Sequence, residues 1–98
     1  MCRRKKLPLI ADEIYEGVTY EEPIRTFAEL STDDVTVFKC SGLTKRWLGP
    51  GWRCGWLIVY ANEENFKKYW NSLKGIFNIL LMPHTIMQAS LKSILNND

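Results

Sequence analysis

Three short segments of the chain consist almost entirely of apolar residues, at 7–11, 35–40 and 55–61. Their length and their β-branched and aromatic residues are typical of strands, and the near absence of polar positions predicts burial on both faces. The sequence therefore predicts part of an α/β sheet whose two faces both need to be covered by helices.

Two later segments have the residue spacing of helices. Asn62 is a suitable N-cap residue, two acids follow it, and apolar residues then recur every three or four positions up to about Gly75. A second helix is predicted from about Pro83, with a Met and Leu stripe that is typical of core packing. Between the strands, the sequence predicts a loop at 15–23, a short helix or turn at 24–30 and a polar break at 31–34. Two helices cannot easily cover both faces of three apolar strands, which indicates that these 98 residues are a fragment or that they need partners to be stable.

The composition is that of a globular protein, with 46% hydrophobic and 24% charged residues. A net charge of +2 is too small to predict nucleic-acid binding by itself. The one basic cluster, RRKK at 3–6, is expected to be a solvated chain end, with a localisation or phosphate patch as the alternative. No signal peptide follows it and no run of 18 apolar residues exists, so we expect no membrane partner.

The three cysteines, Cys2, Cys40 and Cys54, are widely spaced and form no paired CxxC element. Neither a disulfide framework nor a zinc site is expected, and no metal ligands are assigned. Unpaired thiols suit a reducing compartment, so we expect a cytoplasmic location.

Four side chains with distinct chemistry lie next to the predicted strands. Asp12 and Tyr15 follow the first strand, while Lys45 and Arg53 flank the turn-rich connection between the second and third strands. If the first two strands are parallel neighbours, all four side chains emerge at one edge of the sheet, where open α/β sheets bind ligands.

These residue types suit a phosphorylated pyridine cofactor. A carboxylate keeps the ring nitrogen protonated, which makes the ring an electron sink. A lysine forms the Schiff base, an arginine grips the phosphate in a bidentate fork, and a phenol donates to the ring oxygen.

ADEIY at 11–15, followed by SGLTKRWLGPGWRCGW at 41–56, resembles the core of a fold-type I, pyridoxal-phosphate-dependent aminotransferase. The sequence is most similar to the tyrosine aminotransferase group, whose members carry ADEIY and KRWxxPGWRxGW. The resemblance runs from about Leu7 to Leu95 and leaves the basic residues 1–6 outside it. It implies a partial three-layer α/β/α sandwich, a fragment of the large cofactor-binding domain.

The resemblance also implies roles for single residues. Asp12 would pair with the pyridinium nitrogen and Tyr15 with the ring hydroxyl. Lys45 would carry pyridoxal 5'-phosphate as a Schiff base and shuttle the proton, and Arg53 would bind the phosphate. The expected substrates are an amino acid, of the tyrosine or aromatic type, and a 2-oxo acid, and a homodimer is expected for the full-length family.

The sequence departs from the family pattern near the lysine. Many relatives have a phosphate-binding serine three residues before the lysine, where this chain has Gly42. Ser41, one residue earlier, is the expected substitute if the loop shifts. Nothing here resembles the family's upstream cofactor-cupping segment, its NPxNP-like segment or its downstream carboxylate-binding arginine.

Three other interpretations stay open. One is a truncated, inactive fragment that keeps cofactor ligands, which the unbalanced helix coverage favours. A different fold-type I reaction, such as that of a C–S lyase or a cyclopropane-carboxylate synthase, fits the same residues. A nucleic-acid module would use Trp47, Trp52 and Trp56 for base stacking, but these tryptophans are expected to pack around the lysine loop.

Overall fold

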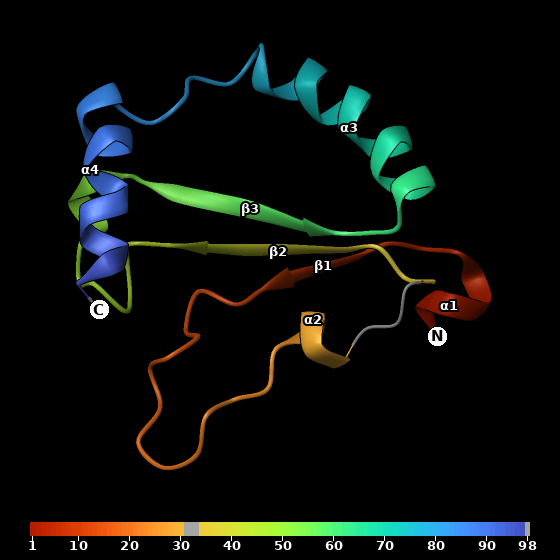
Figure 1. Ribbon diagram of the computed structural model, residues 1–98, viewed down its shortest axis with the longest axis horizontal. Coiled ribbons are helices and arrows are strands. Elements are labelled where there is room, and N and C mark those ends of the chain that lie inside the picture. The colour runs from red at the N-terminus through yellow and green to blue at the C-terminus, as the bar shows by residue number, and fades with distance from the viewer. Residues whose placement is uncertain (31–33, 98) are drawn as a thin grey trace.

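The computed structural model describes residues 1–30 and 34–97 and contains one three-stranded sheet. The strands β1 (Leu9–Asp12), β2 (Val37–Gly42) and β3 (Gly55–Tyr60) lie side by side in chain order (Figure 1). β1 and β2 are parallel, and β3 runs antiparallel to β2. All three predicted strands are confirmed, each with its bounds shifted by at most two residues.

The strand register separates the sheet into two faces. Ala11 pairs with Lys39 and Lys39 with Ile58, so these side chains share one face. Phe38 points to the other face, where its ring meets Tyr69 edge-on at 5.4 Å between centroids. The two faces therefore have different neighbours.

The helices follow the predicted capping signals. The Asn62 side chain accepts a hydrogen bond from the Asn65 N–H at 2.9 Å, which satisfies one free donor of the first turn. The His84 ring nitrogen accepts from the Ile86 N–H in the same way, which makes His84 the cap of the last helix. The helical elements are α1 (Cys2–Lys5), α2 (Phe27–Leu30), the short 3-10 turn η1 (Pro50–Trp52), α3 (Glu63–Phe77) and α4 (Thr85–Asn96).

Two predicted helix bounds were slightly wrong. The first long helix continues two residues past Gly75, because an exposed glycine weakens a helix without ending it. The second begins two residues after Pro83, because His84 supplies the cap. The short helix expected within 24–30 is α2, and the polar break expected at 31–34 lies almost entirely outside the described residues.

The partial sandwich is confirmed, with thin outer layers. α3 reaches the Phe38 face, and the segment that contains α2 lies on the Lys39 face. Figure 1 shows α3 and α4 arching around the β3 side of the sheet. No residue of either long helix is buried. The buried hydrophobic side chains of the described chain are those of Ala11, Val37, Phe38, Leu43 and Cys54.

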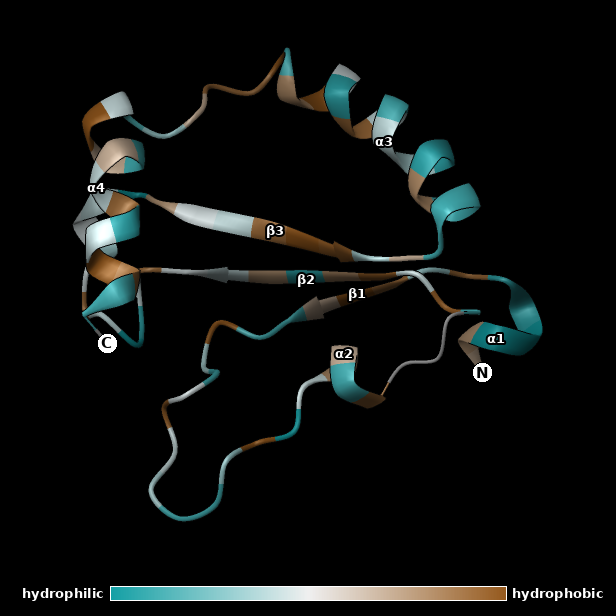
Figure 2. Ribbon diagram, viewed as in Figure 1, coloured by the Kyte–Doolittle hydropathy of each residue, from teal (hydrophilic) through white to brown (hydrophobic). Residues whose placement is uncertain are grey.

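Much apolar surface stays exposed. Ile10 on β1 is 73% exposed, and the connection between α3 and α4, brown in Figure 2, carries the exposed Ile79 and Leu81. The prediction that two helices leave the sheet incompletely covered is confirmed. None of the described helices is both long and apolar enough to cross a membrane.

Gly42 lies where β3 leaves little room for a side chain on β2. A Cβ built on Gly42 would lie 2.9 Å from the Cys54 carbonyl oxygen, and that oxygen belongs to backbone. We expect Gly42→Ala to lower the free energy of unfolding by about 1–3 kcal/mol. Gly75→Ala is the matched control, because nothing lies within 4 Å of its Cβ position; it should raise stability by about 1 kcal/mol. Urea unfolding of both variants checks this, and equal effects would contradict it.

Candidate functional site at the carboxyl ends of β1 and β2

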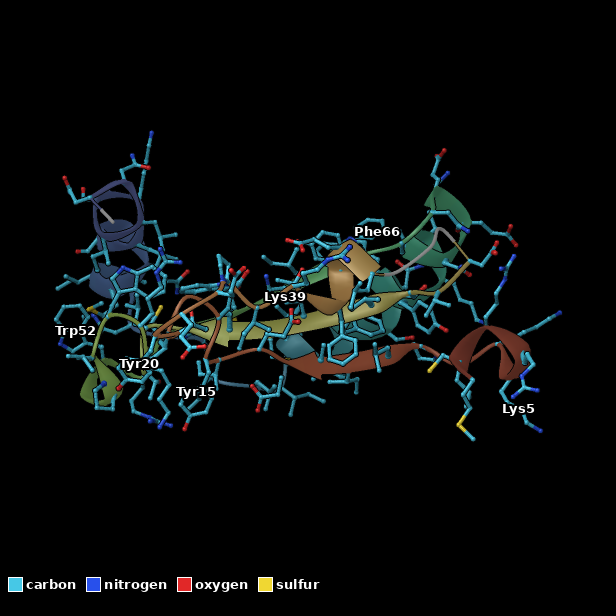
Figure 3. The ribbon with its side chains drawn as sticks, turned by 90° about the horizontal axis from the view of Figure 1, so that it is seen from below. Lys5, Tyr15, Tyr20, Lys39, Trp52 and Phe66 are labelled. Atoms are coloured by element: carbon cyan, nitrogen blue, oxygen red, sulfur yellow. The ribbon has the colours of Figure 1, made fainter. Side chains whose placement is uncertain are left out.

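The predicted site residues meet at one end of the sheet. Asp12 ends β1, Lys45 follows the end of β2, and Arg53 precedes the start of β3. Because β1 and β2 are parallel and β3 is antiparallel, these three points lie at the same end. Figure 3 shows the labelled Tyr15 and Trp52 at this end and Lys5 at the opposite one.

Tyr15 and Lys45 are in direct contact. The Lys45 Nζ lies 5.2 Å from the centroid of the Tyr15 ring, within the range of a cation–π interaction. Tyr15 is 57% exposed and Lys45 is half-buried, so both functional groups face an accessible space. A phenol and an amine 30 residues apart are thus brought together by the parallel pairing of β1 and β2.

Asp12 and Arg53 complete the set from either side. The Asp12 carboxylate is exposed and accepts a hydrogen bond from the Ile14 N–H at 3.4 Å. The Arg53 guanidinium donates to the Pro50 carbonyl at 3.2 Å. Among the described residues, no hydrogen bond or ion pair joins either of them to Lys45. They share its end of the sheet.

Arg53 has a strained backbone. Its φ is 50°, in the left-handed region that favours glycine. It directly follows η1, so this conformation reverses the chain into β3. Such outliers persist only where the surroundings hold them, and they cluster at functional sites.

The loop that carries Lys45 is held by packing and backbone hydrogen bonds. Leu43 is fully buried, its N–H donates to the Cys54 carbonyl at 3.1 Å, and its carbonyl accepts from Gly49 at 2.9 Å. Trp47 and Trp56 meet edge-on at 5.9 Å between ring centroids. These contacts hold the backbone that carries Lys45 in place.

Trp52 differs from the packing role predicted for it. The residue is 50% exposed and lies on η1, at the surface of the loop. Its ring covers Gly49, where a Cβ would lie 3.3 Å from the ring edge. The tryptophan therefore shields backbone at the loop surface and contributes little to the core.

Ser41 lies within β2, opposite Trp56, and is half-buried. Its strand position alternates with that of Gly42, so the two side-chain positions point to opposite faces of the sheet. A serine side chain at position 42 would crowd the Cys54 carbonyl oxygen. Ser41 as a phosphate contact stays a prediction.

A buried lysine lies next to the site, and the sequence analysis did not single it out. Lys39, in the middle of β2, is 6% exposed and its Nζ lies 2.6 Å from Glu16 and 3.7 Å from Glu13. Burial lowers the pKa of Lys39, but the hydrogen bond to Glu16 and the charges of Glu16 and Glu13 outweigh it and raise the pKa above 10.5. Glu13 is thus a salt-bridge partner of this lysine. The sequence signal that could have identified this pair is a lysine inside an apolar strand, because a buried ammonium needs an acidic partner.

A cavity of about 620 Å³ lies away from these residues, near the chain start and the first turn of α3. Arg3, from the basic cluster, lines it and pairs with Asp34 at 2.6 Å, with both side chains more than half exposed. None of the predicted site residues lines this cavity. The candidate site itself is an open edge.

Comparisons with known proteins show the family to which this chain is similar. The sequence model of the family described as aminotransferase class I and II matches residues 1–98. Human tyrosine aminotransferase is 40% identical over 97 residues, which cover 97% of this chain and 21% of that protein. S-alkyl-thiohydroximate lyase from Arabidopsis thaliana is 30% identical over 97 residues, covering 96% of this chain and 21% of the relative.

Among solved structures, alanine aminotransferase from Pyrococcus furiosus superimposes with a TM-score of 0.77 and 30% sequence identity. The match covers 86% of this chain and 21% of that one. The mixed sheet with its flanking helices is therefore a piece of the α/β fold of such enzymes. The chain belongs to the class I and II aminotransferase family.

The chain spans about a fifth of the length of these relatives. The family match includes residues 1–6, and a boundary after residue 6 stays a prediction.

Proposed function

We propose that this chain supplies the lysine-bearing part of a pyridoxal-phosphate-dependent aminotransferase of the tyrosine type. The observation that carries the proposal is the contact between Lys45 and Tyr15 at the sheet edge that also holds Asp12 and Arg53. Human tyrosine aminotransferase, at 40% identity, supports the choice of an aromatic amino acid and a 2-oxo acid as substrates.

The residues present fit pyridoxal 5'-phosphate by their chemistry. When bound, this cofactor supplies an electron sink for the negative charge that forms at the α-carbon of an amino acid. Asp12 would pair with its ring nitrogen and Arg53 would donate to its phosphate. Tyr15 would donate to its ring oxygen, next to the lysine.

Lys45 has two tasks in this proposal. Its amine would hold the cofactor covalently by the aldehyde carbon, and once displaced by substrate it would move the proton at the substrate's α-carbon. Both tasks need an amine that reaches accessible space while its backbone is held in place. The half-buried Lys45, above the Leu43 and Trp47 contacts, meets that need.

A second reaction has a specific observation in its favour. The Arabidopsis relative is named as a lyase of S-alkyl-thiohydroximates and matches nearly the whole chain at 30% identity. The same lysine would serve C–S bond cleavage. Visible absorbance on addition of pyridoxal 5'-phosphate tests cofactor binding for both reactions. Assays with tyrosine plus a 2-oxo acid, or with an S-alkyl-thiohydroximate, then separate them in the protein that includes the family's remaining length.

Replacing Arg53 with glycine should change stability and cofactor binding in opposite directions. Glycine relieves the left-handed strain at φ 50°, so the free energy of unfolding should rise by about 0.5 kcal/mol. The lost guanidinium should weaken pyridoxal 5'-phosphate binding about 10- to 100-fold. Pyridoxal, which lacks the phosphate, is the control ligand and should bind both chains equally. An equal loss of affinity for the two ligands would show that Arg53 does not bind the phosphate.

A further inference from the structure

The turn that carries Tyr15 is not fixed by burial of the tyrosine itself. Tyr15 is 57% exposed, yet its ring lies against the Lys45 ammonium. The side chain has two rotatable bonds to its ring, so the position of the ring depends on the backbone of the turn. The residues on either side of Tyr15 must therefore hold that backbone.

Both flanking acids converge on one buried ammonium. The Lys39 Nζ lies 2.6 Å from the Glu16 carboxylate and 3.7 Å from that of Glu13, with side-chain exposures of 7% for Lys39 and 11% for Glu13. The Glu13 Oε2 is buried and, within the described residues, has no hydrogen-bond partner. The charge of Lys39 is thus what compensates its burial. Burial strengthens this interaction and resists displacement of either acid.

Glu13 also ties the turn to the rest of the fold. Its N–H donates to the Cys40 carbonyl on β2 at 3.0 Å, and its Oε1 accepts from the Phe27 N–H of α2 at 2.7 Å. The Glu16 N–H closes the turn onto the Glu13 carbonyl at 3.0 Å. The turn is therefore anchored at two points, 13 and 16, and Tyr15 lies between them.

We propose that Lys39 is a positioning residue: by pairing with Glu13 and Glu16 it fixes the turn so that the Tyr15 ring stays against Lys45. Lys39 acts on the Tyr15 turn through its ion pairs with the two acids. Any effect of Lys39 on cofactor binding rests on the proposed function. Its effect on the position of the Tyr15 ring relative to Lys45 does not.

The test replaces Glu16, the closer partner, with glutamine. Glu16 is partly exposed, so Glu16→Gln removes the charge of the pair without leaving a large cavity. In the unmodified chain, NMR should show the Lys45 ε-methylene protons shifted upfield by the Tyr15 ring, with cross-peaks to that ring. Glu16→Gln should reduce this shift by more than half. Glu63→Gln, which breaks the equally short 2.6 Å exposed pair with Lys67, should leave it unchanged.

Three results would overturn the proposal: no upfield shift in the unmodified chain, an unchanged shift in Glu16→Gln, or the same loss in Glu63→Gln. Amide signals of β2 and β3 report whether the sheet is intact. If Glu16→Gln loses them, Glu16→Asp replaces it, because it keeps the charge and shortens the reach. A reduced shift in that variant supports the proposal, and an unchanged one overturns it.

A second readout separates this proposal from the proposed function. Covalent capture of pyridoxal 5'-phosphate at Lys45 should be about 10- to 100-fold slower in Glu16→Gln than in Glu63→Gln, because the phenol is misplaced. Equal rates in the two variants would show that the turn does not serve the cofactor. If the unmodified chain captures no cofactor, the proposed function fails, while the NMR comparison still decides the role of Lys39.

Discussion

A chain with Lys45→Ala is expected to form no covalent lysine adduct with pyridoxal 5'-phosphate, so the visible band of that adduct should be absent. The alanine removes the amine that the fold holds against Tyr15 at the edge shared with Asp12 and Arg53. Without a covalent bond, only the ionic contacts to the phosphate and ring remain. Absorbance titration of the purified chain measures the effect.

Lys68→Ala is the matched control for that change. Lys68 also lies over a tyrosine ring, with its Nζ 5.6 Å from the Tyr69 centroid, but on α3 and away from the site. It should leave adduct formation unchanged. An adduct band of equal size in Lys45→Ala, or its loss in Lys68→Ala alone, would contradict the assignment of Lys45.

Lys39→Met is expected to have the largest effect on stability, lowering the free energy of unfolding by about 3 kcal/mol. The substitution leaves Glu13 buried without a compensating charge. Lys67→Met is the control, because the Lys67–Glu63 pair is also 2.6 Å long but exposed on α3, and its loss should cost less than about 0.5 kcal/mol. Urea unfolding of both variants measures these changes. Sulfate is added because it stabilises the folded state, so that the fraction folded before urea is added is large enough to measure.

The pH dependence of this difference has a definite sign. The folded-state pKa of Lys39 is raised above 10.5, because its hydrogen bond to Glu16 and the nearby acids outweigh burial. The stabilisation is therefore fully present below pH 10.5 and is lost as the pH rises through the higher folded pKa. Above neutral pH, the difference in unfolding free energy between the unmodified chain and Lys39→Met should narrow in that alkaline range. A gap that narrows between pH 7 and 9 would show that Lys39 is not paired as the structure has it.

The strands and the long helices could be predicted because their signals are local. Continuous apolar runs mark β2 and β3, and a capping asparagine followed by acids marks the start of α3. The exact helix ends were less predictable, because Gly75 and Pro83 only bias the backbone while tertiary contacts and the His84 cap decide it. The exposure of Trp52 depends on the path of the 43–54 loop, which residue type alone does not reveal.

The residues of the candidate site were chosen by residue type and order, which does not by itself place them near one another in space. Whether Asp12, Tyr15 and Lys45 meet depends on β1 and β2 being parallel neighbours, which the sequence left as a condition and the pairing of Asp12 with Cys40 fulfils. The left-handed backbone of Arg53 carries no sequence signal, since arginine rarely adopts it. The buried pairing of Lys39 needed the same strand register to become visible.

The most direct test of the central claim maps where the cofactor attaches. The purified 98-residue chain is mixed with pyridoxal 5'-phosphate, reduced with borohydride, digested and analysed by peptide mass spectrometry. We predict a phosphopyridoxyl group on Lys45 and on no other lysine, because Lys45 combines a firmly held backbone, the Tyr15 contact and a position at the sheet end that also holds Arg53. Labelling spread over the surface lysines, or no labelling at all, would contradict it.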